Sequence, residues 1–343
     1  MRSHPFLRCA LCALFAIGVV SHTSAHASVI LTTFATPPAP LSGFGTIGFA
    51  YAGNKFVGSV QRDGTGVLYS TNLTGGAAAV FAPTVNLISS PASEHFVASS
   101  LGLGGFPSRD IYVAAGNTVV HITNDGLSSN TFVTLPNSAD QVRGIFFDAV
   151  GTFGNEMIIT TTTGNIYTVT SAGVATLLAS VHEDTEGADV APIGANFGLF
   201  DGQLIVASEG SGTIRAISNT GLVTVVTHVT SAEELTFVPI NLGASGNPVE
   251  GFYGANYTPN VQKGDVSQFT SFLGDVIVTG ESTGIINRIH FNGSSFVVTN
   301  EGSFPNQPED GIFVTAAIVN AGSPIPEPAT LAVLGLSLAG LVG

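Results

Sequence analysis

A two-strand phrase recurs five times along this chain of 343 residues and strongly limits the folds it can adopt. Each copy is an apolar strand that ends in small residues, a glycine-containing turn and a second strand. The copies occupy residues 54–60 with 66–70, 110–115 with 118–122, 156–161 with 165–169, 203–209 with 213–217, and 275–281 with 285–289. Hairpin turns such as Asn124-Asp125-Gly126 lead into a third strand. A further short strand precedes the later units, at 145–147, 188–190, 235–238 and 312–314.

Four strands per unit, repeated every 45 to 70 residues or so, are typical of β-propeller blades. We therefore predict an all-β chain, a β-propeller of five or six four-stranded blades, with a β-sandwich as the runner-up. The number stays open because residues 241–270 add about thirty residues inside the fifth unit. No segment has a sustained helical period, which argues against a doubly wound nucleotide-binding fold. Between residues 47 and 316 the repeats resemble propellers of the NHL, gluconolactonase and YVTN kind.

The first residues have the pattern of a secretory signal peptide. Arg2 and Arg8 precede an apolar run from Cys9 to Val20, and the small residues Ala25 and Ala27 then stand two apart. We predict that signal peptidase cleaves after Ala27. The apolar run is shorter than the roughly 20 residues of a membrane-spanning helix, which argues against an anchor. Because both cysteines lie within this segment, the mature chain is expected to have no disulfide.

The last residues contain Pro326, Glu327 and Pro328, followed by an apolar segment from Thr330 to Gly343. This tail resembles the PEP-CTERM sorting signal of Gram-negative bacteria. The resemblance implies that a membrane-embedded exosortase recognises the three residues and processes the protein for release or surface display. The chain would touch the inner membrane only through this tail, in bacteria that build exopolysaccharide matrices or biofilms. No arginine cluster of the kind that closes the family pattern precedes Gly343, so a truncated chain and a degenerate signal both stay open.

The expected organisation is a signal peptide at 1–27, an N-terminal segment at 28–46, a propeller at 47–320 and a sorting tail with a short apolar helix at 321–343. Without Arg2 and Arg8 the chain keeps seven basic residues against 23 acidic ones, a formal charge of −16. Such a surface repels phosphate backbones, which excludes nucleic acid as a partner. A negative surface of this kind can bind divalent cations, or it can keep the protein soluble outside the cell.

Acidic residues recur at one position of the repeat. Alignment of the short opening strands places Glu94, Arg143, Glu186, Glu234 and Asp310 at equivalent positions. Opening strands line the central channel of a propeller, so these residues are expected to form a ring at one mouth. Four such carboxylates would repel one another and gain from Ca²⁺, which binds about 6 to 8 oxygens. We predict a Ca²⁺ site of Glu94, Glu186, Glu234 and Asp310; the alternative is separate surface acids that make only a negative funnel.

No catalytic motif is present in the sequence, neither Gly-x-Ser-x-Gly, nor His-Glu-x-x-His, nor a phosphate-binding loop. We assign no catalytic residue and expect an exported surface or extracellular propeller that binds a ligand, exopolysaccharide or another surface protein without catalysis. The second hypothesis is a metal-dependent lactonase or esterase at the channel mouth. The resemblance to gluconolactonase-like propellers implies an axial metal that polarises a lactone, although the asparagine ligands of such sites match no position here.

Overall fold

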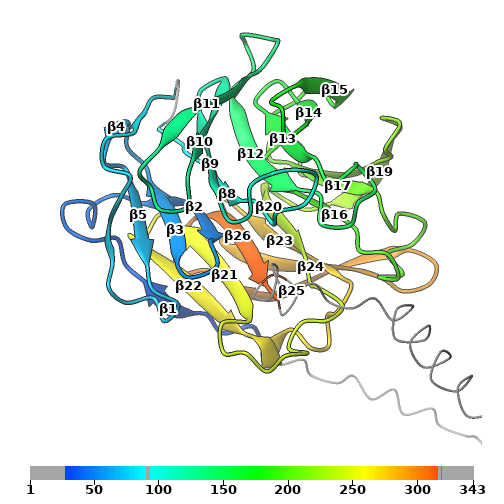
Figure 1. Ribbon diagram of the computed structural model, residues 1–343. Helices are drawn as coiled ribbons and strands as arrows, with labels where there is room; N and C mark the ends of the chain where they lie inside the picture. The colour runs from blue at the N-terminus through cyan, green and yellow to red at the C-terminus, as the bar shows by residue number, and fades with distance from the viewer. Residues whose placement is uncertain (1–27, 90–92, 316–317, 319–343) are drawn as a thin grey trace, which may run out of the picture.

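The chain forms six four-stranded antiparallel sheets around a central axis in a computed structural model, which describes residues 28–89, 93–315 and 318 (Figure 1). Each sheet is one blade of a β-propeller. The predicted fold class is therefore confirmed, with six blades. The expected signal peptide and the sorting residues Pro326, Glu327 and Pro328 lie outside the described residues.

Blades 1 to 5 each follow the chain from the innermost strand outward. Blade 1 contains β2 (Thr46–Tyr51), β3 (Phe56–Val60), β5 (Leu68–Thr71) and β6 (Ala79–Phe81). Blade 2 contains β8 (Val97–Ser99), β9 (Ile111–Ala115), β10 (Thr118–Ile122) and β11 (Ser129–Thr134). Blade 3 contains β12 (Val142–Phe147), β13 (Met157–Thr161), β14 (Asn165–Val169) and β15 (Ala175–Ser180). Blade 4 contains β16 (Ala188–Val190), β17 (Leu204–Ser208), β18 (Thr213–Ile217) and β19 (Val223–His228). Blade 5 contains β20 (Ala232–Phe237), β23 (Val276–Gly280), β24 (Ile285–Phe291) and β25 (Phe296–Ser303).

Blade 6 is assembled from three separate parts of the chain. From the axis outward it contains β26 (Pro308–Val314), β21 (Gly251–Asn256), β22 (Asn260–Asp265) and β1 (Thr32–Ala35). The hairpin β21–β22 lies between the first and second strands of blade 5 in sequence, so the extra residues noticed within the fifth unit supply the middle of the sixth blade. The N-terminal strand β1 closes the ring by pairing with β22, for example Thr32 opposite Lys263.

Two small elements complete the described structure. Strands β4 (Gly64–Thr65) and β7 (Asn86–Leu87) form a two-stranded sheet, and η1 (Val266–Gln268) is a single 3₁₀ turn after β22. No helix within the described ranges has the length and apolar character that a membrane crossing requires.

Small residues in the innermost strands let neighbouring blades approach each other near the axis. A Cβ atom on Gly187 would lie 2.3 Å from the backbone nitrogen of Leu235 in blade 5, and one on Gly48 would lie 2.4 Å from that of Val97 in blade 2. No side chain fits at such distances. Glycine in these strands is therefore a consequence of closing six sheets around one axis.

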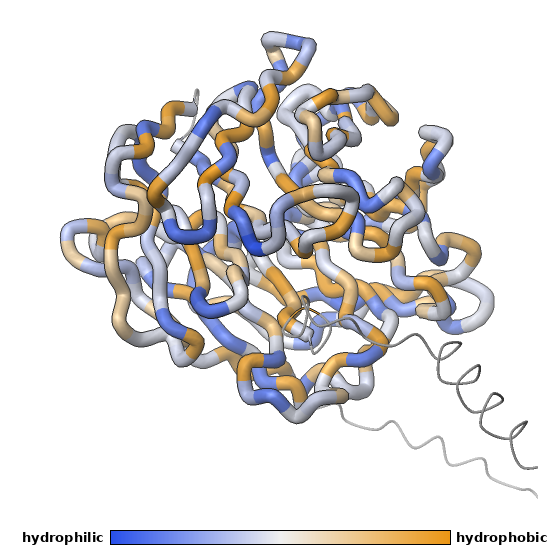
Figure 2. Tube along the Cα trace, viewed as in Figure 1, coloured by the Kyte–Doolittle hydropathy of each residue, from blue (hydrophilic) through white to orange (hydrophobic). Residues whose placement is uncertain are grey.

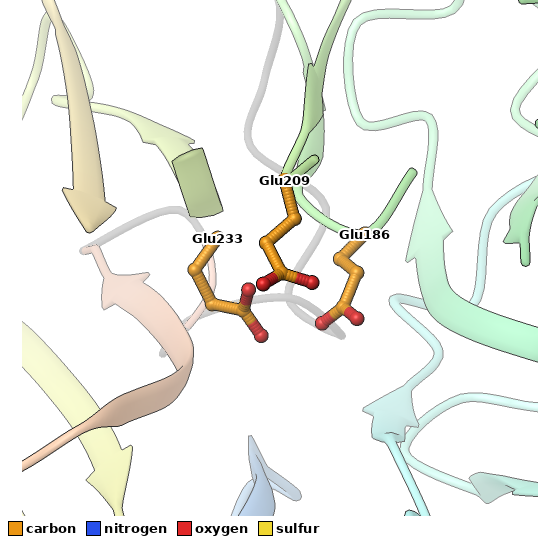
Figure 3. Close-up of side chains that lie close together, drawn as sticks. All are labelled: Glu186, Glu209 and Glu233. Carbon is orange, nitrogen blue, oxygen red and sulfur yellow. The ribbon is translucent and has the colours of Figure 1, made fainter. Parts of the chain in front are cut away.

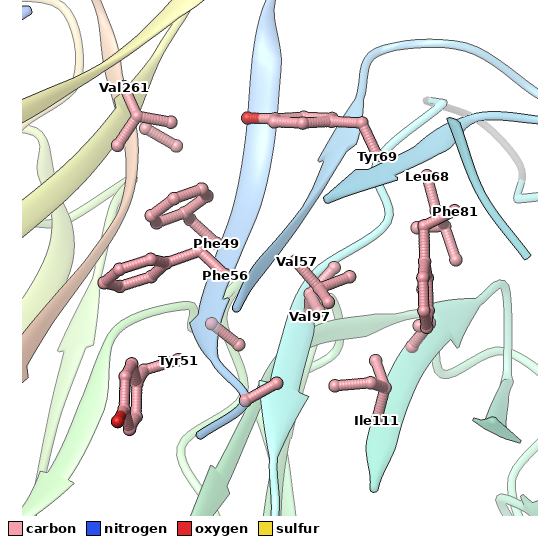
Figure 4. Packing of buried hydrophobic residues seen from close by; sticks show 14 of the residues in the cluster. Phe49, Tyr51, Phe56, Val57, Leu68, Tyr69, Phe81, Val97, Ile111 and Val261 are labelled. Atoms are coloured by element: carbon pink, nitrogen blue, oxygen red, sulfur yellow. The ribbon is translucent and has the colours of Figure 1, made fainter. Parts of the chain in front are cut away.

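Aromatic side chains fill the interface where blade 6 meets blade 1 (Figure 4). Phe49 and Phe56 stack with their ring centroids 5.1 Å apart, and Tyr253 of blade 6 lies 4.7 Å from Phe56. The ring centroid of Phe34, in β1, also lies 4.7 Å from that of Tyr253, and this contact fixes the closing strand to the cluster. Such contacts add to area burial in stabilising the interface. Figure 2 shows hydrophobic residues along most strands, and strands such as β3 and β17 are buried along their whole length, as expected of sheets that pack on both faces.

Candidate functional site

The innermost strands all begin at the same face of the propeller, and acidic residues cluster there. Five of the charged residues lie at or just before the starts of inner strands: Glu94, Arg143, Glu186, Glu233 and Glu309. Glu209 and Glu281 directly follow the second strands β17 and β23, and Asp184 lies in the loop before β16. We call these eight residues the acidic mouth. It brings together seven carboxylates and one guanidinium from blades 2 to 6.

Arg143 supplies the positive charge of the acidic mouth. Its guanidinium forms ion pairs with Glu94 of blade 2 and Glu186 of blade 4, and its Nε lies 3.3 Å from Asp184 Oδ1. The Arg143 side chain is only 14% exposed, so these pairs are partly shielded from water. One arginine cannot neutralise seven carboxylates. Protons or other cations must therefore balance the remaining carboxylates.

Three glutamates of the acidic mouth lie close enough to share one cation. One carboxylate oxygen from each of Glu186, Glu209 and Glu233 lies within 4.8 Å of those of the other two (Figure 3). We call them the glutamate triad. Glu186 Oε2 and Glu233 Oε2 are buried and accept no hydrogen bond from the part of the chain that the structure describes. A buried charged oxygen without a partner costs several kcal/mol, which a bound cation or a proton would remove.

The carboxylates around the triad already hold protons more tightly than usual. Burial raises the pKa of Glu233 well above its usual range, while Arg143 acts in the opposite direction and Glu209 adds to the increase. A hydrogen bond with Glu209, together with burial, raises the pKa of Glu281 to about 8. Burial and the neighbouring carboxylate of Glu233 also raise the pKa of Glu309. A metal cation that replaces these protons would stabilise the carboxylates of the acidic mouth in their charged form.

The structure separates the four carboxylates that the sequence alignment grouped. Glu94 and Glu186 lie in the acidic mouth, both paired with Arg143. Glu234 and Asp310 instead line an axial cavity of about 190 Å³ further along the channel. We call this the lower cavity. Of the predicted Ca²⁺ ligands, Glu186 alone belongs to the glutamate triad.

A one-residue shift explains the difference. The inner strands carry β-bulges, between Ala232 and Leu235 in blade 5 and between Pro308 and Asp310, opposite Ala255 and Asn256, in blade 6. Each bulge changes which of two consecutive residues faces the mouth, because side chains alternate along a strand. Glu233 and Glu309 take the positions that the alignment gave to Glu234 and Asp310. Glu209 was missed because it belongs to the second strand of its blade, and a comparison of Ser208-Glu209 with Gly280-Glu281 could have found it.

Comparison with known proteins gives the fold and no function. No family model matches the chain, and no curated protein matches it in sequence. A chain of the nidogen–laminin complex is similar in structure, with a TM-score of 0.52 and 12% identity over 79% of this chain and 85% of that chain. A protein of unknown function from Bacteroides thetaiotaomicron has a TM-score of 0.50 and 9% identity over 82% of this chain and 69% of its own. Streptogramin B lyase, at a TM-score of 0.47 and 14% identity, covers 84% of this chain and 92% of its own.

Proposed function

We propose that this protein is an exported β-propeller of the bacterial surface or extracellular matrix, and that its acidic mouth binds acidic exopolysaccharide through a divalent cation. Export rests on the residues around Ala25 and Ala27, and sorting by an exosortase on Pro326, Glu327 and Pro328. Both belong to the terminal segments of the sequence. The binding function rests on the described propeller.

The strand directions support display of the acidic mouth away from an anchoring membrane. Inner strand β26 runs from Glu309 at the mouth to Val314 at the opposite face. Because β1 is antiparallel to β22, β22 to β21 and β21 to β26, β1 begins at that same opposite face. Strand β1 therefore begins, and β26 ends, at the face opposite the mouth. A tail held in the membrane would leave the mouth open to ligands.

The glutamate triad carries the proposed function. Its single most informative feature is the pair of buried oxygens, Glu186 Oε2 and Glu233 Oε2, without a hydrogen-bond donor among the described residues. Three carboxylates supply three to six of the roughly 6 to 8 oxygens that Ca²⁺ prefers. Carboxylates of a matrix polysaccharide can supply the remaining ones. The cation would thus join two acidic partners that otherwise repel each other.

Retention on an acidic polysaccharide tests this function. Purified protein should bind immobilised polygalacturonate in Ca²⁺ and be released by EDTA, whereas a neutral dextran should not retain it. Glu209→Gln with Glu233→Gln should abolish retention, because two of the three triad charges are lost while side-chain volume is kept. Asp265→Asn removes a charge whose side chain is 74% exposed at the opposite face and should bind normally. Retention that survives EDTA or the double change would reject the proposal, and capture of a surface protein instead would replace the polysaccharide by another partner.

Hydrolysis of a lactone or ester at the same mouth is the second candidate function. The raised pKa of Glu281, about 8, keeps a protonated carboxyl beside the glutamate triad at neutral pH, as a general acid requires. A cation bound there would polarise a carbonyl. Turnover of small lactones or aryl esters in the presence of Ca²⁺, lost in Glu281→Gln, would favour this function. Absence of turnover with Ca²⁺, Mg²⁺ and Zn²⁺ would reject hydrolysis and keep binding as the proposed function.

A further inference from the structure

The lower cavity is separate from the acidic mouth and has a different lining. All six innermost strands contribute to it, and its volume is about 190 Å³. Aromatic and aliphatic side chains form most of the wall, among them Tyr51, Phe146 and Phe313. The charged residues that line it are Asp189, Glu234 and Asp310, all of them acidic. A cavity of roughly this size, about 150 Å³, accommodates a small ring in other proteins.

Two of the three carboxylates have a structural role. Asp310 Oδ2 of blade 6 accepts a hydrogen bond of 2.7 Å from the backbone N–H of Phe49 in blade 1. Asp189 Oδ2 of blade 4 accepts one of 2.8 Å from the N–H of Phe237 in blade 5. Each aspartate thus joins its blade to the next one. These bonds account for the presence of Asp189 and Asp310 without any ligand.

Glu234 has no comparable role. The residue is 5% exposed, and its carboxylate accepts a hydrogen bond from the backbone N–H of the adjacent Leu235, within its own blade. Neither Glu234 nor the two aspartates form an ion pair with a basic residue of the described propeller. Room for Glu234 is made by Gly311, where a Cβ atom would lie 3.1 Å from Glu234 Cγ. A buried carboxylate in a largely apolar cavity without a countercharge is destabilising, so its presence there points to a ligand.

We propose that the lower cavity binds a small organic cation, an alkylammonium whose charge faces Glu234 and whose alkyl groups pack against the aromatic wall. The cavity volume exceeds the space of several water molecules, and apart from the three carboxylates the wall is mostly apolar, which suits an organic cation better than a bare metal ion. Aromatic rings and carboxylates together are the surroundings that favour substituted ammonium groups. This site is independent of the cation proposed for the glutamate triad.

Choline and its neutral isostere 3,3-dimethylbutan-1-ol test the proposal on the unmodified protein. Both have nearly the same shape, and only choline carries a charge. In isothermal titration at constant ionic strength, with EDTA present, choline should bind with a Kd in the millimolar range or below. The isostere should bind at least tenfold more weakly. Equal affinity for the two molecules, or no choline binding, would overturn the proposal without need of a variant.

A substitution then locates the site. Glu234→Gln keeps the side-chain size and removes the charge, so choline binding should weaken at least tenfold and become similar to that of the isostere. Asp265→Asn, at the outer end of β22, should leave choline binding unchanged. Unaltered choline affinity in a folded Glu234→Gln variant would show that the ammonium group binds elsewhere. Should this variant fail to fold, saturation-transfer NMR of choline against the isostere on the unmodified protein gives the decision.

Discussion

At the scale of single residues, Arg143 determines how much negative charge the acidic mouth can hold. Arg143→Met keeps an apolar stem and removes the partner of Glu94, Asp184 and Glu186. Breaking a largely buried pair in this way costs about 3 kcal/mol of unfolding free energy, because the carboxylates stay uncompensated. Urea unfolding should show that loss, and Ca²⁺ should restore more stability to the variant than to the unmodified protein. A variant as stable as the unmodified protein would mean that the carboxylates are already neutral.

The two interblade aspartates predict how stability depends on pH. Burial raises the pKa of Asp189 to about 6 and that of Asp310 to about 7, although hydrogen bonds from Phe237 and Phe49 respectively act against the increase. Raised values mean that the folded state binds these protons more tightly than the unfolded chain. Their contribution is complete below about pH 4 and is lost as pH rises through 6 to 7. The melting temperature should therefore rise from pH 8 to pH 5, and Asp310→Asn should flatten this slope. If Asp310→Asn leaves this slope unchanged, other acidic residues cause the pH dependence of the melting temperature.

At the scale of elements, the strand hairpins could be predicted from sequence and the sixth blade could not. The hairpins are local, so alternating apolar residues and glycine turns are sufficient to find β9–β10 or β17–β18. Blade 6 pairs strands that are far apart in the chain, such as Thr32 of β1 with Lys263 of β22, and no local pattern encodes that pairing. The inner-strand bulges that place Glu233 at the mouth are also outside the repeat pattern.

Removal of residues 28–36 tests the closing strand. The change deletes β1, leaves the edge of β22 unpaired and takes Phe34 out of the aromatic cluster with Tyr253. We expect a loss of about 3 kcal/mol or more in urea unfolding, since the change removes the buried Val29 together with the partly buried Phe34. The open edge should also promote self-association, visible by size-exclusion chromatography. A monomer with an unchanged urea midpoint would show that β22 needs no partner.

At the scale of the whole molecule, we expect the propeller and its proposed sorting signal to be separate units. Pro326 and Pro328 cannot continue a sheet or a helix interior, so the tail is expected to be independent of the blades. Glu327→Ala should therefore change where cells place the protein, measured by fractionation. The melting temperature of the purified protein should stay the same. A drop of many degrees would make the tail a structural element.

The central claim is that the glutamate triad binds a divalent cation, and calorimetric titration of Ca²⁺ into metal-free protein tests it most directly. We predict one ion per chain, and stabilisation that follows RT ln(1 + [L]/Kd), about 2.7 kcal/mol when Ca²⁺ is at 100 times Kd. Glu209→Gln with Glu233→Gln should abolish both effects, and Asp265→Asn should retain them. Magnesium and sodium chloride at matched ionic strength control for general screening of the acidic chain. Calcium that binds the double variant as well as the unmodified protein, or that stabilises no more than these salts, would contradict the claim.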